Sequence, residues 1–165
     1  MKQTITILGS TGSIGTNSID VILRNLNKFT VYSLTSKENI NLLVKQCHYL
    51  KPKVVAIQNK EKYKTLKKLL FGKRIKVLAG DDGILECTNY KTDITIASIV
   101  GIAGLKPTLN AITNTSKLCL ANKECLVSAG KIFMDKIKKC NCKLLPLDSE
   151  HNSIFQLCDF KNPKI

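Results

Sequence analysis

Tryptophan is absent from this sequence of 165 residues, and aromatic residues make up only 5% of it. Arginine is almost as scarce: of the 26 lysines and arginines, only Arg24 and Arg74 are arginine. Proteins that bind nucleic acids rely on arginine clusters and on aromatic side chains that stack against bases. We therefore interpret the formal net charge of +14 as a solvated, lysine-covered surface and expect no nucleic-acid partner. Such a surface attracts small molecules that carry phosphate.

The sequence also lacks a long hydrophobic run, because no window approaches the roughly 18 to 20 unbroken apolar residues that a transmembrane helix needs. The first apolar run breaks at Gly9, a pattern that is typical of neither a signal peptide nor a transit peptide. We expect a cytoplasmic protein that does not associate with a membrane.

The seven cysteines are odd in number and scattered along the chain, which is not the pattern of a disulfide framework. Cys140 and Cys142 are the closest pair, but no second pair of cysteines or histidines lies near them in the sequence. They therefore make a poor zinc site. We expect free thiols that are buried or incidental.

Short β-branched runs alternate with segments of helical periodicity along a chain long enough for one domain with a core. The expected strands are residues 4–8, 29–34, 53–57, 74–80, 93–99, 117–121 and 143–147, and the expected helices are 18–26, 38–50, 60–70, 81–89, 105–114 and 123–139. This alternation predicts a mostly parallel sheet. Right-handed crossovers then give a Rossmann-like, doubly wound α/β fold with helices on both faces.

The stretch ILGSTGSIG places Gly9, Gly12 and Gly15 between the first expected strand and the first expected helix. Glycine permits a tight turn from strand to helix and lets the backbone approach a pyrophosphate closely. The N-terminus of the following helix offers unpaired N–H groups and a dipole that favours anions. The context predicts a dinucleotide-binding loop. Further hydroxyl donors are Ser10, Thr11 and Ser13.

The end of the second expected strand bears on the choice of dinucleotide. In NAD-binding folds an acidic residue at this place binds the ribose hydroxyls, and a cation nearby accommodates a 2′-phosphate. Here Lys37 favours NADPH, whereas Glu38 favours NADH. This stretch alone leaves both cofactors open.

Two further stretches carry candidate functional side chains. LANKECLV places Asn122, Lys123 and Glu124 between a strand and the longest expected helix, where doubly wound folds bind ligands and where a lysine can neutralise a phosphate or an oxyanion. In LLPLDSEHNSIFQ, Asp148 and Glu150 alternate along the chain, so in an extended segment both carboxylates point the same way and suit Mg²⁺ or Mn²⁺. The alternative is that Ser149 and its neighbours cap a helix.

Taken together, ILGSTGSIG, LANKE and LPLDSEHNSIFQ, in this order and at these separations, closely resemble 1-deoxy-D-xylulose 5-phosphate reductoisomerases. IVGIAGLKPTLNAI is similar to the family's mid-domain segment, and the resemblance covers essentially the whole chain. It implies an NADPH-dependent enzyme with a divalent metal that converts the phosphosugar 1-deoxy-D-xylulose 5-phosphate to 2-C-methyl-D-erythritol 4-phosphate in non-mevalonate isoprenoid biosynthesis. It also implies a homodimer.

The resemblance assigns roles to particular positions of this sequence. Cofactor binding would fall to Thr11, Gly12, Ser13, Ile14, Asn39, Asn122 and Glu124. Lys123 and Glu150 would be catalytic, and substrate binding would use Lys123, Ser149 and Glu150. Asp148 and Glu150 would bind Mg²⁺ or Mn²⁺, and His151 would be a structural neighbour.

The sequence departs from the family pattern in two respects. Lys37 and Glu38 stand where the family commonly has Gly-Lys, so a carboxylate would repel the 2′-phosphate of NADPH. The family also continues into a third metal carboxylate, a phosphate clamp, a closing loop and a C-terminal helical domain. We therefore expect residues 1–147 to form the NADPH-binding domain and 148–165 to begin a truncated catalytic domain, with no turnover by this chain alone. The alternative is a free-standing dinucleotide-binding module without catalysis.

Overall fold

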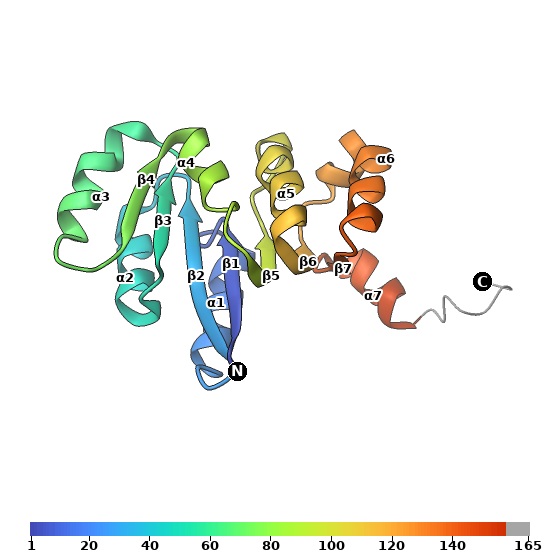
Figure 1. Cartoon of the computed structure of the whole chain (residues 1–165), viewed down its shortest axis with the longest axis horizontal. Coiled ribbons are helices and arrows are strands. Elements are labelled where there is room, and N and C mark those ends of the chain that lie inside the picture. The colour runs from blue at the N-terminus through green and yellow to red at the C-terminus, as the bar shows by residue number, and fades with distance from the viewer. Residues whose placement is uncertain (158–165) are drawn as a thin grey trace, which may run out of the picture.

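The computed structural model describes residues 1–157, which form seven strands, seven α-helices and three short 3₁₀ helices (Figure 1). The strands are β1 (Gln3–Leu8), β2 (Phe29–Ser36), β3 (Val54–Ile57), β4 (Lys76–Ala79), β5 (Thr92–Ala97), β6 (Thr115–Leu120) and β7 (Lys143–Pro146). The α-helices are α1 (Ser13–Leu23), α2 (Ile40–Leu50), α3 (Tyr63–Leu69), α4 (Gly80–Glu86), α5 (Leu105–Ala111), α6 (Glu124–Lys139) and α7 (Ser149–Leu157). The 3₁₀ helices are η1 (Lys60–Lys62), η2 (Ile102–Gly104) and η3 (Ile112–Asn114).

All seven strands belong to one parallel sheet with the order β4-β3-β2-β1-β5-β6-β7. The chain first builds outward from β1 to β4, then returns to the centre and builds outward from β5 to β7. The order therefore reverses between β1 and β5, which is the topological switch point where open α/β sheets bind ligands. The Rossmann-like, doubly wound fold expected from the sequence is confirmed.

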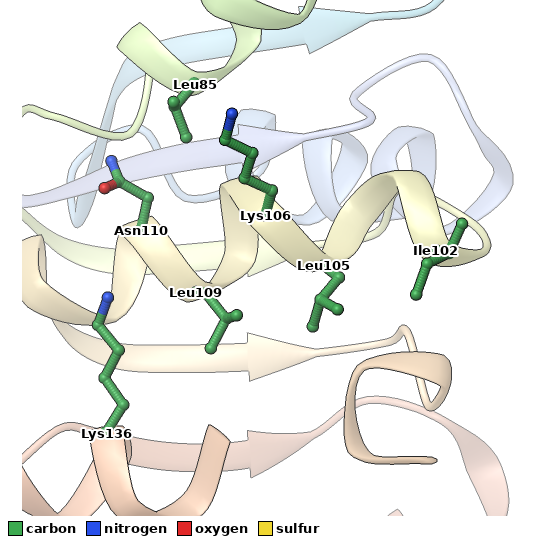
Figure 2. Close-up of a pocket in the computed structure, with 7 residues that line it drawn as sticks. All are labelled: Leu85, Ile102, Leu105, Lys106, Leu109, Asn110 and Lys136. Atoms are coloured by element: carbon green, nitrogen blue, oxygen red, sulfur yellow. The ribbon is translucent and has the colours of Figure 1, made fainter. Parts of the chain in front are cut away.

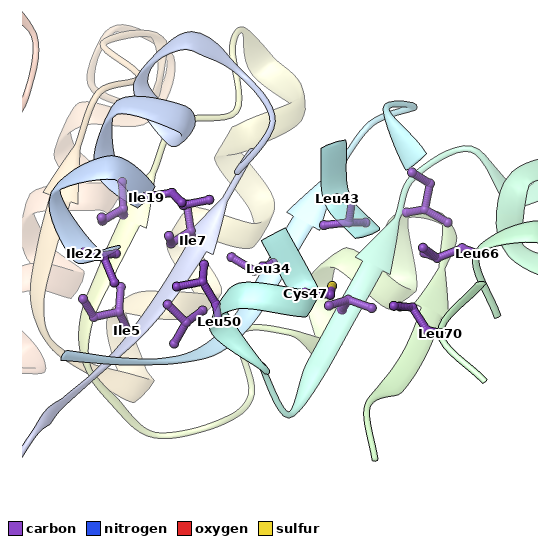
Figure 3. Close-up of a cluster of buried hydrophobic side chains, with 14 residues drawn as sticks. Ile5, Ile7, Ile19, Ile22, Leu34, Leu43, Cys47, Leu50, Leu66 and Leu70 are labelled. Atoms are coloured by element: carbon purple, nitrogen blue, oxygen red, sulfur yellow. The ribbon is translucent and has the colours of Figure 1, made fainter. Parts of the chain in front are cut away.

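The sheet is covered on both faces, and its inner strands are buried along consecutive positions: the last four residues of β1 and all four of β3 are buried. Ile5 and Ile7 of β1 belong to a core with residues from α1, α2 and α3 (Figure 3). On the other face, Val54 and Ala56 of β3 pack with residues of α4, and strands β5 and β6 pack with α5 and α6. The molecule has three layers, and α7 contacts β7 at one edge of the sheet.

The observed elements differ from those expected mainly at the first helix and in the segment after β7. The first helix begins at Ser13, five residues earlier than the range 18–26, so Gly15 lies inside its first turn. A helix also forms at residues 149–157, where the metal interpretation assumed an extended segment. No helix within residues 1–157 is long and apolar enough to cross a membrane.

The described cysteines are mostly packed inside. Cys47, Cys87, Cys125 and Cys142 are buried free thiols, whereas Cys119 and Cys140 are partly exposed. Burial raises the pKa of Cys47 to about 12, and it raises the pKa of Cys87 to about 12 as well. At neutral pH these two side chains are protonated and behave as small hydrophobic groups. Cys158 lies outside the described residues.

Candidate dinucleotide site at the switch point

The switch point lies between the ends of β1 and β5. Leu8 of β1 is in register with Ala97 of β5, and the Ser98 hydroxyl donates a hydrogen bond of 2.7 Å to the Leu8 carbonyl. Gly9 has a φ of +83°, and a Cβ there would lie only 3.0 Å from the Ser98 carbonyl carbon and oxygen. Glycine is therefore required at position 9 both for the turn and for the close approach of the two chains.

The remaining two glycines of the loop have different surroundings. Gly15 is buried, and a Cβ there would lie 2.3 Å from the Gly9 carbonyl oxygen. Gly12 is the exposed N-cap of α1 with an ordinary φ of −79°, and the nearest atom to a Cβ at that position is the Gly9 carbonyl oxygen at 3.4 Å. Because no side chain caps this helix, its first N–H groups remain available to an anion. Packing therefore requires glycine at position 15, whereas the surroundings of Gly12 leave room for a side chain.

Side chains from β2 and α2 hold the loop in place. The hydroxyls of Thr11 and Ser36 are hydrogen-bonded at 2.8 Å. The buried Ser10 hydroxyl donates to Oε1 of Gln46 at 2.7 Å, and the Gln46 amide donates to the Ser10 carbonyl at 2.9 Å. Ser10 is fully buried, so the expectation that its hydroxyl is a phosphate donor is wrong. Ser13 is exposed and Thr11 is half-buried.

The segment after β2 turns directly into α2. Lys37, Glu38 and Asn39 are exposed. The Asn39 side chain caps α2, because its Oδ1 accepts a hydrogen bond of 3.0 Å from the N–H of Leu42. This cap accounts for the asparagine structurally and places it beside the end of β2, where a dinucleotide's adenosine ribose lies in this class of fold.

Asn122, Lys123 and Glu124 follow β6 at the same edge as the glycine loop, because Ala97 is in register with Leu120. Parallel strands lie about 4.8 Å apart, so the ends of β1 and β6 are separated by about 10 Å. The expected placement of these three residues between a strand and the longest helix is confirmed. Lys123 is exposed and Glu124 is half-buried at the N-terminus of α6.

Asn122 differs from its two neighbours because it is only 3% exposed. Its amide donates to the carbonyls of Ile99 at 2.5 Å and Gly101 at 2.8 Å, while its Oδ1 accepts from the Cys125 N–H at 3.3 Å. A Cβ at Gly104 would lie 2.5 Å from the Asn122 amide nitrogen. The side chain thus ties the loop after β5 to the start of α6.

Asp148, Ser149 and Glu150 follow β7, whose end is in register with β6 through the pair of Leu120 and Pro146. Asp148 is the N-cap of α7: its Oδ1 accepts from the N–H of His151 at 2.9 Å and contacts the His151 imidazole at 2.5 Å. Partial burial acts to raise the pKa of Asp148, but the hydrogen bonds from His151 outweigh it and lower that pKa. A helix cap is therefore present here, with Asp148 rather than Ser149 as the capping residue.

The donor chemistry of this segment suits a divalent cation only in part. Asp148 and Glu150 are hard oxygen donors of the kind that Mg²⁺ prefers. One oxygen of Asp148 already serves the cap, and Glu150 is exposed on the first turn of α7. Within residues 1–157 no group of three or more His, Cys, Asp or Glu side chains could hold a metal ion. The described residues alone therefore do not form a complete metal site.

A cavity of about 400 Å³ lies elsewhere, along α5 between α4 and α6 (Figure 2). Leu105 and Leu109 of α5 contribute apolar lining, and Lys106 and Lys136 also line it. The Asn110 amide beside it is already bonded to Thr88 and Asn89. The hollow lies on a helical face rather than at the switch point, so it is not the candidate dinucleotide site.

Three residues that support the loop were not predicted from the sequence: Gln46, Thr35 and Ser98. Gln46 has a recognisable signal, because it occupies the apolar stripe of α2 beside Leu43 and Leu50, where a polar residue needs a buried partner. Thr35 and Ser98 lie at strand ends and accept or donate bonds to the backbone of residues 8–9. Short hydroxyl residues in strands carry no comparable signal.

Comparison with known proteins identifies a family. Residues 5–130 match the sequence profile of 1-deoxy-D-xylulose 5-phosphate reductoisomerase. The enzyme of that name from Thermoanaerobacter pseudethanolicus is 46% identical over 156 residues, which cover 94% of this chain and 40% of the relative.

Two solved structures are similar over nearly the whole chain. The Zymomonas mobilis reductoisomerase in complex with NADPH has a TM-score of 0.94 at 41% identity, covering 98% of this chain and 43% of that one. A DOX-P reductoisomerase in complex with NADPH, fosmidomycin and magnesium has a TM-score of 0.90 at 33% identity, covering 96% and 40%.

The chain spans about 40% of the length of these relatives and corresponds to their N-terminal portion. The profile match extends over most of the 165 residues, and it includes both the glycine loop and the segment after β6. The chain therefore belongs to the 1-deoxy-D-xylulose 5-phosphate reductoisomerase family.

Proposed function

We propose that this chain is the NADPH-binding portion of a reductoisomerase that acts on 1-deoxy-D-xylulose 5-phosphate. The observation that carries the proposal is the exposed Gly12 and the open N-terminus of α1, placed at the switch point of a sheet that resembles an NADPH complex at a TM-score of 0.94. The pyrophosphate of NADPH would accept hydrogen bonds from Thr11, Ser13 and the N–H of Ile14. Bound NADPH would supply a hydride to the substrate.

The segment after β6 is proposed to bind the other half of the dinucleotide. Glu124 and Asn122 would lie beside the NADPH, at a distance from the glycine loop that a dinucleotide can span. Lys123, exposed at the same edge, would neutralise the substrate's negative charge. Its exposure and position support this role, because its ammonium is available to an anion.

Asp148, Ser149 and Glu150 are proposed to belong to the substrate and metal site of the complete enzyme. Asp148 and Glu150 would hold the magnesium together with ligands from outside residues 1–157, and Ser149 and Glu150 would contact the substrate. Residues 148–165 would then begin the catalytic domain. Cytoplasmic location and a homodimeric assembly, which the resemblance implies for the complete enzyme, belong to the same proposal.

Equilibrium titration tests the proposed function. The 165-residue polypeptide is mixed with NADPH, and the fluorescence of the reduced nicotinamide is followed as protein is added. We expect saturable binding with one dinucleotide per chain, and competition by NADP⁺. A signal that never saturates, while circular dichroism shows a folded chain, would contradict the proposal.

A further inference from the structure

The segments that follow β2 and β3 are joined at the carboxyl edge of the sheet. The Gln58 N–H donates to the Ser36 carbonyl at 2.9 Å, and the Asn59 N–H donates to the Lys37 carbonyl at 3.0 Å. These two backbone bonds fix η1 beside residues 37–39. A side chain of η1 can therefore act at the end of β2, although more than 20 residues separate the two in the sequence.

Lys62 is the residue of η1 that reaches this place. Its ammonium donates to the Glu38 carbonyl at 3.0 Å and lies 3.9 Å from a carboxylate oxygen of Glu38. The side chains are 38% and 57% exposed respectively, so solvent reaches both. A lysine has three N–H donors, and the carbonyl takes one of them. The others remain available to an anion.

The position matters because the end of β2 is where doubly wound folds distinguish their dinucleotides. A carboxylate there binds the ribose 2′-hydroxyl and repels a 2′-phosphate, whereas a nearby cation accommodates the phosphate. Glu38 alone therefore favours NADH. The pairing with Lys62 offsets the charge of Glu38 and adds a second cation beside Lys37.

We propose that Lys62 determines cofactor specificity in this protein: it pairs with Glu38 and binds the adenosine 2′-phosphate of NADPH. The inference rests on the proposed function, because it assumes that a dinucleotide occupies the switch point. It adds a cation from η1 that lies outside all the stretches that carry the family resemblance.

Lys60 provides a matched control from the same 3₁₀ helix. It has the same charge, but its side chain lies against Gly80, where a Cβ would meet Lys60 Cε at 2.3 Å. Lys60 is thus directed toward the start of α4 rather than toward Glu38. Removing the charge of Lys60 should change the electrostatic potential at the carboxyl edge of the sheet without removing a contact to the 2′-phosphate.

The experiment is calorimetric titration with NADPH and with NADH at one fixed ionic strength, because exposed charges are screened by salt. The proteins are the unmodified chain, Lys62→Met, Lys60→Met, Glu38→Gln and the double variant Glu38→Gln/Lys62→Met. We expect Lys62→Met to weaken NADPH binding about tenfold, as for loss of one charge-assisted hydrogen bond, and to leave NADH within about twofold. Lys60→Met should leave both within about twofold. Lys62→Met should still weaken NADPH binding in the Glu38→Gln background.

Thermal melts first establish that every variant is folded. Unchanged NADPH affinity in Lys62→Met, or an equal loss for both dinucleotides, would overturn the proposal while leaving the proposed function intact. Full recovery of NADPH affinity in the double variant would show that Lys62 acts only on Glu38, and would overturn the phosphate contact. If the unmodified chain binds neither dinucleotide, the proposed function fails and the specificity proposal fails with it.

Discussion

Gly15 packs so closely against Gly9 that a Cβ on Gly15 would lie 2.3 Å from the Gly9 carbonyl oxygen. The clash is with backbone, which cannot move aside without opening the loop. Three residues earlier, a Cβ on Gly12 would make only ordinary contact, at 3.4 Å. We therefore expect separable roles for the two glycines, with Gly15 needed for folding and Gly12 for ligand access.

Alanine substitutions test this separation. We expect Gly15→Ala to lower the free energy of unfolding by about 1–3 kcal/mol, as overpacking does. Gly12→Ala should change it by less than about 0.5–1 kcal/mol, because its φ of −79° suits alanine, yet weaken NADPH binding. Urea denaturation and NADPH titration measure the two effects. The reverse pattern, with Gly12→Ala the less stable protein, would show that the loop packs differently.

We expect the Asn122 side chain to stabilise the folded state. Replacing it with alanine leaves the carbonyls of Ile99 and Gly101 without their donor, which costs about 1–3 kcal/mol. Asn122→Asp should cost more, because a carboxylate oxygen would face those carbonyls. Asn25→Ala is the control, since its amide bond to the Val21 carbonyl is exposed. Equal unfolding midpoints for the alanine variants at positions 25 and 122 would refute this role.

Stability should depend on pH through Asp93. Its carboxylate accepts from the N–H of Thr4 at 2.7 Å and from the Thr4 hydroxyl at 2.8 Å, joining β1 to β5. The N–H bond and then the hydroxyl bond lower the pKa of Asp93. A lowered folded-state pKa means that this stabilisation is present above the ordinary value near 4 and is lost as pH falls through the folded-state value.

The variant Asp93→Asn isolates that contribution. We expect it to be less stable than the unmodified protein at pH 7, and the difference between the two should shrink as pH is lowered below about 4. Chemical denaturation of both proteins across that range provides the measurement. A difference that stays constant with pH would mean that the charge of Asp93 contributes nothing.

Much of the fold was predictable because the alternation of strands and helices is continuous and the glycine loop is local. The shared edge of Gly12 and Asn122 also follows once the sheet is known to be parallel. The sequence could not show that the Asn122 amide donates hydrogen bonds to two backbone carbonyls, or that Lys62 lies beside Glu38. Both contacts join segments that are about 20 residues apart in the sequence. The local pattern around Asp148 is compatible with a metal ligand and with a helix cap, and it could not show that the backbone after β7 forms a helix that Asp148 caps.

Catalysis should be absent from the 165-residue polypeptide by itself. Two carboxylates, one of them engaged in a helix cap, hold Mg²⁺ loosely, and productive positioning also needs the substrate enclosed. The assay mixes the chain with 1-deoxy-D-xylulose 5-phosphate, NADPH and Mg²⁺ or Mn²⁺ and follows the nicotinamide absorbance. Substrate-dependent oxidation that disappears in Lys123→Ala would prove this prediction wrong.

The central claim is that a dinucleotide binds at the switch point, and amide chemical shifts locate it most directly. The ¹⁵N-labelled chain is titrated with NADPH, and each backbone amide is followed. We expect the largest shift changes at Thr11, Gly12, Ser13 and Ile14, with further changes at residues 37–39 and 122–124. Changes concentrated instead along α5 and α6, at the hollow lined by Leu105 and Lys136, would contradict it.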